Sequence, residues 1–216
     1  MYFIKSPYIL SKLTGKSIIW QIPNDKNRIF ITFDDGPIPD VTPKILSILN
    51  KYNSKATFFC VGENVMKHPD IYNDIIENGH CIGNHTFNHL NGWLTSTEKY
   101  LENVKKSETF IVTNLFRPPY GKITPNQVNK IRKKYFTILW SVLSGDFDKN
   151  ISGQQCLENV INNTVGGSII VFHDSIKAKE RVLYALPKFI EHFQKCGYKF
   201  EAITNEILLE YRNNNL

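Results

Sequence analysis

The chain has 216 residues, of which 42% are hydrophobic and 21% are charged, and its formal net charge is +6. This composition excludes a disordered or collagen-like chain, and the length suffices for one α/β domain with its own core. The positive charge favours anionic surfaces, but no nucleic-acid-binding motif accompanies the scattered basic residues, so we expect no nucleic-acid partner.

Residues 1–27 contain no apolar stretch of the kind that directs secretion, because a proline and three lysines interrupt the apolar residues between Tyr2 and Trp20. No apolar run is long enough for a transmembrane helix. The four cysteines form no Cys-x-x-Cys pair, which favours a reducing compartment. We therefore expect a cytoplasmic protein, most simply a monomer, with residues 1–27 as an extension that packs on the main domain.

Residues 7–16 of this extension form a weakly basic amphipathic stretch. Such a stretch either contacts a membrane surface, which would make the protein membrane-peripheral, or caps the core of the domain. We favour the second interpretation.

From residue 28 onward, strand patterns alternate with helix patterns. Runs of β-branched and aromatic residues predict seven strands, at 28–33, 55–61, 80–83, 115–117, 136–142, 168–172 and 198–202. Apolar residues at helical spacing, with caps and terminal glycines, predict helices at 42–52, 69–78, 96–113, 124–134, 152–165, 181–195 and 204–211. Strict alternation means a parallel sheet with right-handed crossovers. We expect a single domain over residues 28–212, a distorted (β/α)7 barrel of parallel strands with outer helices.

Polar residues follow five of these strands. They are Asp34 and Asp35, His85 and His89, Arg117, Asp146, and His173. In a parallel barrel the carboxyl ends of the strands share one rim, where active sites form. Chance does not readily explain this convergence, which therefore predicts an active site.

The pair His85 and His89 is spaced as two metal ligands on one helical turn would be. One carboxylate from the first strand completes a two-His, one-Asp set, which suits a catalytic divalent ion with open positions. We assign Asp35 as this ligand, which leaves Asp34 free. The set suits Zn²⁺ best, with Co²⁺, Ni²⁺, Mn²⁺ or Fe²⁺ as other candidates.

A metal with a free carboxylate beside it indicates hydrolysis, in which the ion polarises a carbonyl and Asp34 takes a proton from water. A leaving amine needs a proton, and His173 is the candidate acid, with Asp146 to hold its ring in the cationic form. Arg117 is placed to pair with Asp34 and keep it ionised.

Together these residues resemble the polysaccharide deacetylase family, the NodB-homology domains of carbohydrate esterase family 4. The resemblance covers about residues 28–202. Its motifs correspond here to Thr32-Phe-Asp-Asp-Gly36, His85-Thr-Phe-Asn-His89, Arg117-Pro-Pro-Tyr120, Trp140-Ser-Val-Leu-Ser-Gly-Asp-Phe147 and Val171-Phe-His173.

The family fold is a distorted (β/α)7 barrel, as the strand count also predicts. The resemblance implies that Asp34 is the catalytic base, that Asp35, His85 and His89 bind the metal, and that His173 is the acid. It also implies that Arg117 orients the base and that the main-chain N–H of Tyr120 helps to hold the oxyanion.

The same resemblance suggests how substrate is held. Val171 is expected near the pocket for the acetyl methyl group, and Pro119 and Tyr120 belong to the third motif. In the fourth motif Leu143 replaces an aspartate and Phe147 replaces a tryptophan, which alters the groove wall. Trp93 either stacks on a sugar or packs in the core.

The expected function is metal-dependent removal of acetyl groups from N-acetylated sugars, such as N-acetylglucosamine units of a peptidoglycan- or chitin-like oligo- or polysaccharide. An O-acetyl esterase on xylan-like sugars and a deacetylase of lipid-linked sugars are alternatives with the same chemistry. A catalytically idle carbohydrate-binding barrel is a third, and its only support is Leu143.

Overall fold

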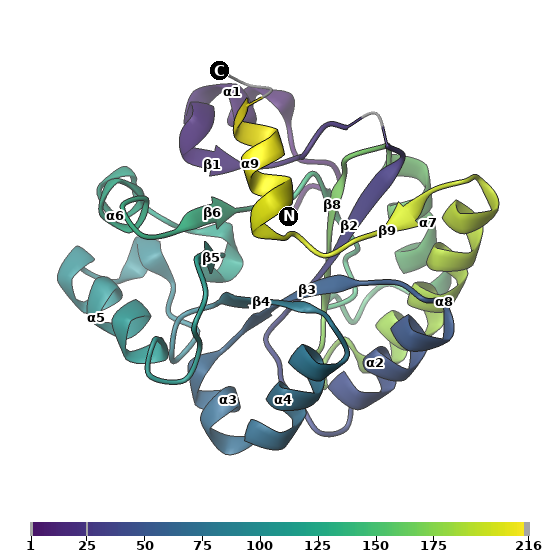
Figure 1. The fold of residues 1–216 in the computed structure, drawn as a ribbon, viewed down its shortest axis with the longest axis horizontal. Helices are drawn as coiled ribbons and strands as arrows, with labels where there is room; N and C mark the ends of the chain where they lie inside the picture. Colours follow the sequence, from purple (N-terminus) through teal and green to yellow (C-terminus); the bar gives the residue numbers. More distant parts are fainter. Residues whose placement is uncertain (1, 25, 214–216) are drawn as a thin grey trace.

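The computed structural model describes residues 2–24 and 26–213, with the side chain of Lys16 left out. Within these residues nine strands form one sheet in the order β1-β6-β5-β4-β3-β2-β8-β7, with β9 beside β2. Their bounds are β1 Ile18–Ile19, β2 Arg28–Asp34, β3 Ala56–Cys60, β4 Cys81–Asn84, β5 Leu115–Phe116, β6 Phe136–Ile138, β7 Val142–Leu143, β8 Ile169–His173 and β9 Lys199–Phe200. Every pairing between these strands is parallel, and helices surround the curved sheet (Figure 1), so the expected distorted (β/α)7 barrel is confirmed.

Strand β2 is the central strand of the barrel. All seven of its residues are buried, and it pairs with β3 on one side and β8 on the other. Its register places Asp34 opposite Phe59 of β3 and His173 of β8. The pairing therefore places Asp34 and His173 side by side, although 139 positions separate them in the sequence.

The helices form the outer layer of the barrel. They are α1 Tyr8–Thr14, α2 Thr42–Lys51, α3 Gly62–Lys67, α4 Pro69–Glu77, α5 Thr97–Ser107, α6 Pro125–Ile131, α7 Gly153–Asn163, α8 Lys179–Lys195 and α9 Asn205–Asn213, with short 3-10 turns η1 Gly15–Ser17, η2 Gly92–Leu94 and η3 Pro119–Gly121. Local sequence explains several starts: α2 and α4 carry proline in their first turn, and α6 and α7 begin with complete capping boxes at Thr124 and Ser152. None of the helices in the described ranges is long and apolar enough to cross a bilayer.

Two features of the sheet differ from the sequence expectation. The stretch expected as one strand over 136–142 forms β6 and β7, which lie at different places in the sheet. Between them, the N–H of Leu139 donates to Ile19 and the N–H of Ser141 donates to Ile169. The expectation of one strand was wrong because the apolar run continues while the chain crosses from one edge of the sheet to the other.

The second difference is that residues 18–22, expected in an extension outside the barrel, form part of its wall. Ile18 and Ile19 pair with β6, and the N–H of Ile22 donates to Gly167 just before β8. Gly167 must be glycine, since its φ is +79° and an added Cβ would lie 2.3 Å from the carbonyl oxygen of Ile22. The N-terminal segment thus closes the gap between β6 and β8.

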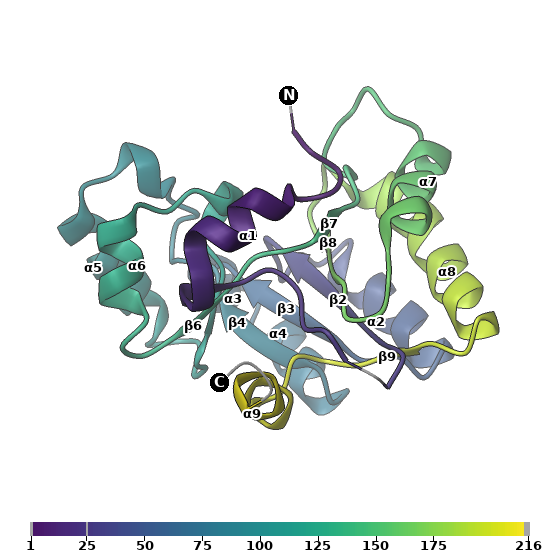
Figure 2. The ribbon, with the colours of Figure 1, turned by 90° about the horizontal axis from the view of Figure 1, so that it is seen from above.

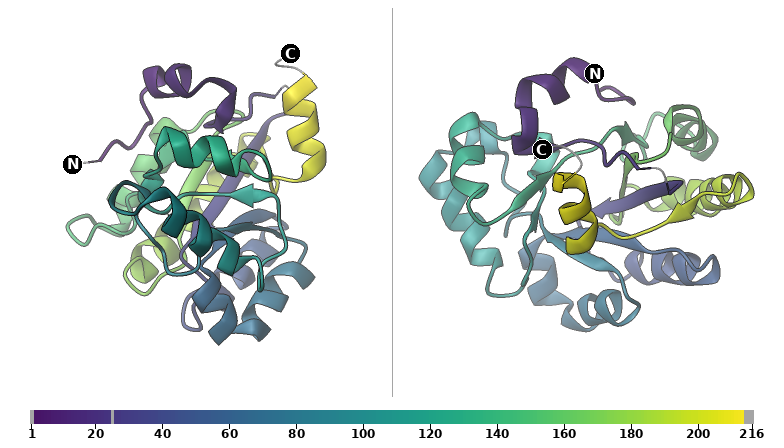
Figure 3. Two further views of the ribbon diagram at one scale, coloured as in Figure 1. Left: turned by 90° about the vertical axis from the view of Figure 1, so that its left-hand side faces the viewer. Right: turned by 45° about the horizontal axis from the view of Figure 1, so that its top comes forward.

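The ends of the barrel are covered differently. At the amino ends of the strands, Ile207 and Leu208 of α9 pack with Ile19 and Ile22 in one apolar cluster. Figure 2 shows α9 at one edge of the molecule and the purple segment that precedes α1 at the opposite edge. Helix α1 lies on the outside of the barrel, beyond the sheet, in both views of Figure 3. The polar residues lie at the opposite end of the barrel, where the strands have their carboxyl ends.

Candidate active site

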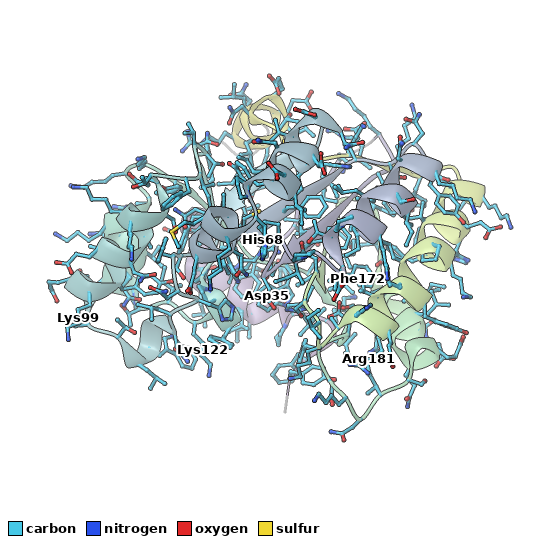
Figure 4. The ribbon with its side chains drawn as sticks, turned by 90° about the horizontal axis from the view of Figure 1, so that it is seen from below. Asp35, His68, Lys99, Lys122, Phe172 and Arg181 are labelled. Carbon is cyan, nitrogen blue, oxygen red and sulfur yellow. The ribbon has the colours of Figure 1, made fainter. Side chains whose placement is uncertain are left out.

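The polar residues that the sequence singled out do meet at one end of the barrel. They come from the ends of β2, β4, β5, β7 and β8 and the loops that follow, and Figure 4 places Asp35 near the middle of the molecule, between Lys122 on one side and Arg181 on the other. This placement follows from the parallel topology, because consecutive parallel strands deliver their carboxyl ends to the same rim.

Arg117, at the end of β5, is fully buried and fixes Asp34. Its Nη1 donates to Asp34 Oδ1 and to Thr32 Oγ1, both at 2.7 Å. Its Nε and Nη2 donate to the carbonyl oxygens of Ile138 and Leu139 at 3.1 Å. The guanidinium therefore holds one carboxylate oxygen of Asp34 and leaves the other, Oδ2, which lies 4.0 Å from His85 Nε2.

Asp35, His85 and His89 form a compact donor set. Their ligand atoms all lie within 4.8 Å of one another, and Asp35 Oδ1 is 3.2 Å from His89 Nε2 and 4.0 Å from His85 Nε2. The second nitrogen of His85 lies 2.7 Å from the carbonyl oxygen of Arg117, which requires Nδ1 to carry the proton and leaves the Nε2 lone pair toward Asp35.

The protonation states of this set suit a cation. Burial lowers the pKa of His85 to about 4, so this imidazole is neutral near pH 7 and able to act as a ligand. Burial alone would raise the pKa of Asp35, but the hydrogen bond from His89 and the charge of His173 hold it well below its usual range. An ionised carboxylate and two imidazoles whose ligand atoms lie within a few ångströms of one another form a donor set that suits a divalent metal such as Zn²⁺, so these residues fit a metal ion.

The two histidines do not lie on a helical turn as the spacing suggested. Residues 85–91 form a loop in which Thr86 and His89 have positive φ values of 64° and 55°. Side-chain acceptors hold this loop: Asn84 Oδ1 accepts from the N–H of Thr86, and Asn103 Oδ1 accepts from the N–H of Phe87. Left-handed residues other than glycine are costly, and such conformations concentrate at functional sites. The side-chain amides of Asn84 and Asn103, which flank this loop, maintain the conformation in which the imidazoles converge.

His173 and Asp146 form the other side of the site. Asp146 is fully buried, and its two oxygens accept from His173 Nδ1 and from the His173 main-chain N–H, each at 2.7 Å. Burial acts to lower the pKa of His173, but the charge and hydrogen bond of Asp146 outweigh it and raise this pKa to about 10. The imidazole is therefore cationic near neutral pH, with Nε2 as the nitrogen left to donate.

A cavity of about 460 Å³ lies between these two groups. Its wall includes Asp34, Asp35, His85, His89 and His173, and several apolar or aromatic side chains also line it, among them Tyr120, Trp140, Leu143, Phe147 and Val171. Tyr120 has a φ of 61°, and its hydroxyl lies 3.2 Å from His89 Nδ1. The cavity is large enough to hold a small ligand, and Asp34 and His173 both face it.

Two residues expected near substrate lie elsewhere. Pro119 is buried behind the wall of the cavity, next to Tyr120 in η3. Trp93 is 63% exposed, so it does not pack in the core. Its indole N–H donates to the carbonyl oxygen of Ile123, and Lys122 lies over its ring. It stands on the surface beyond His89 rather than in the cavity wall.

Three residues of the wall were missed by sequence reasoning: Tyr2, Ser175 and Lys177. Tyr2 Oη donates to Asp148 at 2.9 Å, and its ring lies 5.0 Å from that of Phe147. No local pattern at the start of the chain could have revealed this, because Tyr2 reaches the site through long-range pairing of residues 4–6 with residues 141–143, including Lys5 with Val142 of β7. Lys177 lies in the loop after His173, where its proximity could have been inferred.

Comparison with known proteins identifies the family. The family model described as polysaccharide deacetylase matches residues 21–138. A peptidoglycan-N-acetylglucosamine deacetylase of Bacillus cereus is 35% identical over 204 residues, which cover 91% of this chain and 94% of that protein. The chain belongs to the polysaccharide deacetylase family. It is accordingly a hydrolase of the deacetylase type.

Further relatives of this deacetylase agree with that assignment. A chitooligosaccharide deacetylase of Azorhizobium caulinodans is 33% identical over 177 residues, 76% of this chain and 81% of that protein. The crystal structure of the Bc1960 peptidoglycan N-acetylglucosamine deacetylase superposes with a TM-score of 0.85 at 32% identity, covering 92% of this chain and 95% of that one. Sequence and fold therefore place this chain among the same enzymes.

Gly36 offers a test of how tightly the loop after β2 is packed. Its N–H donates to Asp174 Oδ1 at 2.8 Å, and a Cβ at this position would lie 1.8 Å from Asp174 Oδ2. We predict that Gly36→Ala lowers the free energy of unfolding by about 1–3 kcal/mol, which corresponds to about 2–4 °C in Tm per kcal/mol. Gly166→Ala, whose Cβ would meet nothing closer than 3.6 Å, is the matched control. Equal Tm values for the two variants in thermal denaturation would contradict this prediction.

Proposed function

We propose that this deacetylase hydrolyses the N-acetyl group of N-acetylglucosamine units in a peptidoglycan- or chitin-like glycan, using a divalent metal ion. The observation that carries the proposal is the arrangement of three groups around one cavity: Asp34 held by Arg117, the donor set of Asp35, His85 and His89, and His173 held by Asp146. The names of the relatives support N-acetylated glucosamine as the substrate class.

In this proposal Asp35, His85 and His89 hold the metal, with Zn²⁺ as our first choice. When bound, the ion supplies Lewis-acid chemistry, which acidifies water and polarises the acetyl carbonyl. The tautomer of His85, set by its hydrogen bond to Arg117, keeps Nε2 available for this role. Asp35 stays ionised because of the imidazoles around it.

Asp34 acts as the general base. It takes a proton from the attacking water while the water oxygen forms a bond to the acetyl carbon. Arg117 orients the carboxylate by donating to Oδ1, which leaves Oδ2 as the oxygen available to the water. The left-handed conformation at Tyr120 supports a role for its main-chain N–H in holding the developing negative oxygen.

His173 acts as the general acid. As the carbon–nitrogen bond breaks, it gives a proton to the glucosamine nitrogen, so that acetate and a free amine leave. The hydrogen bond and charge of Asp146 keep the imidazole cationic for this step. An amide needs this proton more than an ester does, so a strongly held acid favours an N-acetyl over an O-acetyl substrate.

The side chains around the cavity select the substrate. Val171 and Leu143 supply an apolar surface suited to the acetyl methyl group, and Phe147 and Tyr120 offer aromatic faces to the sugar ring. Trp93, exposed beyond His89, suits a neighbouring sugar of a longer chain. Leu143 gives little support to an idle barrel, because Asp146 alone satisfies both the ring and the main-chain N–H of His173.

The substrate assignment is tested by acetate release. We expect metal-reconstituted protein to release acetate from N-acetylated chito-oligomers or peptidoglycan fragments at a rate well above that from O-acetylated xylan. Higher kcat/KM on O-acetylated xylan would overturn the substrate class, and no acetate from any of these glycans with any of the candidate metals would overturn the function.

The roles of the two adjacent aspartates are separable. We expect Asp34→Asn to lower kcat by about 10²–10⁴-fold while the protein still binds about one divalent ion per chain. Asp35→Asn, one residue away, is expected to lose both activity and metal because it removes a ligand. Asp40→Asn, on the exposed surface, is the control and should change neither. Elemental analysis with acetate-release kinetics measures both, and loss of metal in Asp34→Asn would contradict the assignment.

The role of His173 as the general acid is tested through the pH dependence of kcat/KM. The Asp146 carboxylate raises the pKa of His173, so Asp146→Asn is expected to lower that pKa and move the alkaline limb of kcat/KM toward lower pH. Asp148→Asn removes a nearby carboxylate that bonds to Tyr2 instead, and should leave the limb in place. A profile of Asp146→Asn whose alkaline limb coincides with that of the wild type would show that His173 is not the proton donor.

A further inference from the structure

The N-terminal arm, which we define as residues 2–14, leaves its large apolar side chains in solvent. Tyr8 is 72% exposed and Leu13 77%, and Phe3, Ile9 and Leu10 are exposed as well. No residue of α1 is buried. Single exposed apolar residues are common on proteins, but a cluster of them in one short segment indicates an interaction surface.

The arm is held to the barrel by polar contacts rather than by its apolar side chains. Lys5 pairs with Val142 of β7, and Ser6 Oγ donates to the carbonyl oxygen of Trp140 at 2.7 Å. At the other end of α1, the indole N–H of Trp20 donates to Thr14 Oγ1 at 2.8 Å. Helix α1 lies across the outside of the barrel in Figure 2. Because both ends are fixed in this way, the apolar side chains between them remain available to another surface.

The charge of the arm indicates what that surface is. The arm contains two lysines, Lys5 and Lys12, and no aspartate or glutamate. Lys5 and Lys12 are exposed, and Lys12 Nζ lies 4.9 Å from the centre of the Tyr8 ring.

Leu13 shares a groove with Arg132, beyond the end of α6. On neighbouring α9 the acidic Glu210 is already paired with Lys26 and Arg28. Exposed aromatic and aliphatic residues with lysines among them match the interface of an anionic bilayer.

We propose that the N-terminal arm binds the surface of an anionic lipid bilayer, with Phe3, Tyr8, Ile9 and Leu13 among the headgroups and Lys5 and Lys12 against lipid phosphates. The contact is peripheral, since α1 has only 7 residues and cannot span a bilayer. The same arm carries Tyr2, which lines the active-site cavity. Binding therefore holds the mouth of the cavity beside the bilayer surface, where an N-acetylated glycan attached to the membrane would be within reach. The proposal does not depend on the reaction the enzyme performs.

Vesicle sedimentation tests the proposal with the full chain. We expect the protein to sediment with vesicles of phosphatidylglycerol and phosphatidylcholine, to bind pure phosphatidylcholine vesicles at least tenfold more weakly, and to be released by 0.5 M salt, because salt screens the lysines. No binding to the anionic vesicles, or equal binding to both kinds, would overturn the proposal.

Two variants and a matched control locate the contact. Tyr8→Ser/Ile9→Ser/Leu13→Ser removes the apolar residues and keeps the lysines, and Lys5→Gln/Lys12→Gln does the reverse; each is expected to weaken binding at least tenfold. Ile76→Ser/Val112→Ser/Val165→Ser removes three exposed apolar residues elsewhere and should bind like the wild type. All substituted side chains are exposed, and activity on soluble oligosaccharide, which none of them contacts, checks folding. Equal losses in the control and the arm variants would overturn the proposal.

The alternative occupant is a second copy of the chain. Light scattering in solution distinguishes it, because a dimer formed through the arm would dissociate in Tyr8→Ser/Ile9→Ser/Leu13→Ser. A wild-type monomer without vesicles supports the bilayer as the partner, and an arm-dependent dimer would overturn it.

Discussion

The buried ion pair of Arg117 and Asp34 is the interaction on which the site depends. Arg117 is fully buried, and its donors reach Thr32 and Asp34 on β2 and the carbonyl oxygens at the end of β6. Removing a guanidinium from water is expensive, and only a nearly complete set of hydrogen bonds with a charged partner offsets that cost. The barrel supplies such a set because the strand ends converge. Arg117 also accepts a hydrogen bond from His85 through its carbonyl oxygen, so one residue orients Asp34 and His85 together.

The remaining groups are aligned by loops whose conformations are costly in isolation. Asp35, Thr86, His89 and Tyr120 all have positive φ values, and all lie within or beside the site. Buried side chains maintain these loops. Asn84 holds the loop of the histidines, and Asp174, directly after His173, accepts from Gly36 and Thr42 in the segment after Asp34. The Asp34 and His173 sides of the cavity are thereby joined by hydrogen bonds as well as by the pairing of β2 with β8.

The N-terminal segment connects barrel closure, the cavity and the outer surface. Residues 18–22 fill the wall between β6 and β8, Tyr2 reaches the cavity beside Phe147, and α1 lies outside between these two contacts. Residues 2–22 thus complete the sheet, shape the wall of the cavity and present an apolar, basic surface. A partner of that surface would be coupled mechanically to the mouth of the active site.

The sequence by itself determined the family of this protein and most of its helices and strands. The strand before Asp34 and the helices α2, α7 and α8 follow from periodicity and caps within a few residues, and parallel topology then predicts that Asp35, His85, His89 and His173 share a rim. Those inferences need only local patterns and one topological rule.

Only the tertiary structure decided which segments complete the barrel and the cavity. The division of residues 136–142 into β6 and β7, the place of Ile18 and Ile19 in the sheet, and the arrival of Tyr2 beside Phe147 depend on contacts between segments that are distant in the sequence, such as Ile18 with Thr137 and Tyr2 with Phe147. Local propensity does not encode such pairings, because the free energy that selects them comes from burying both segments together in the complete fold.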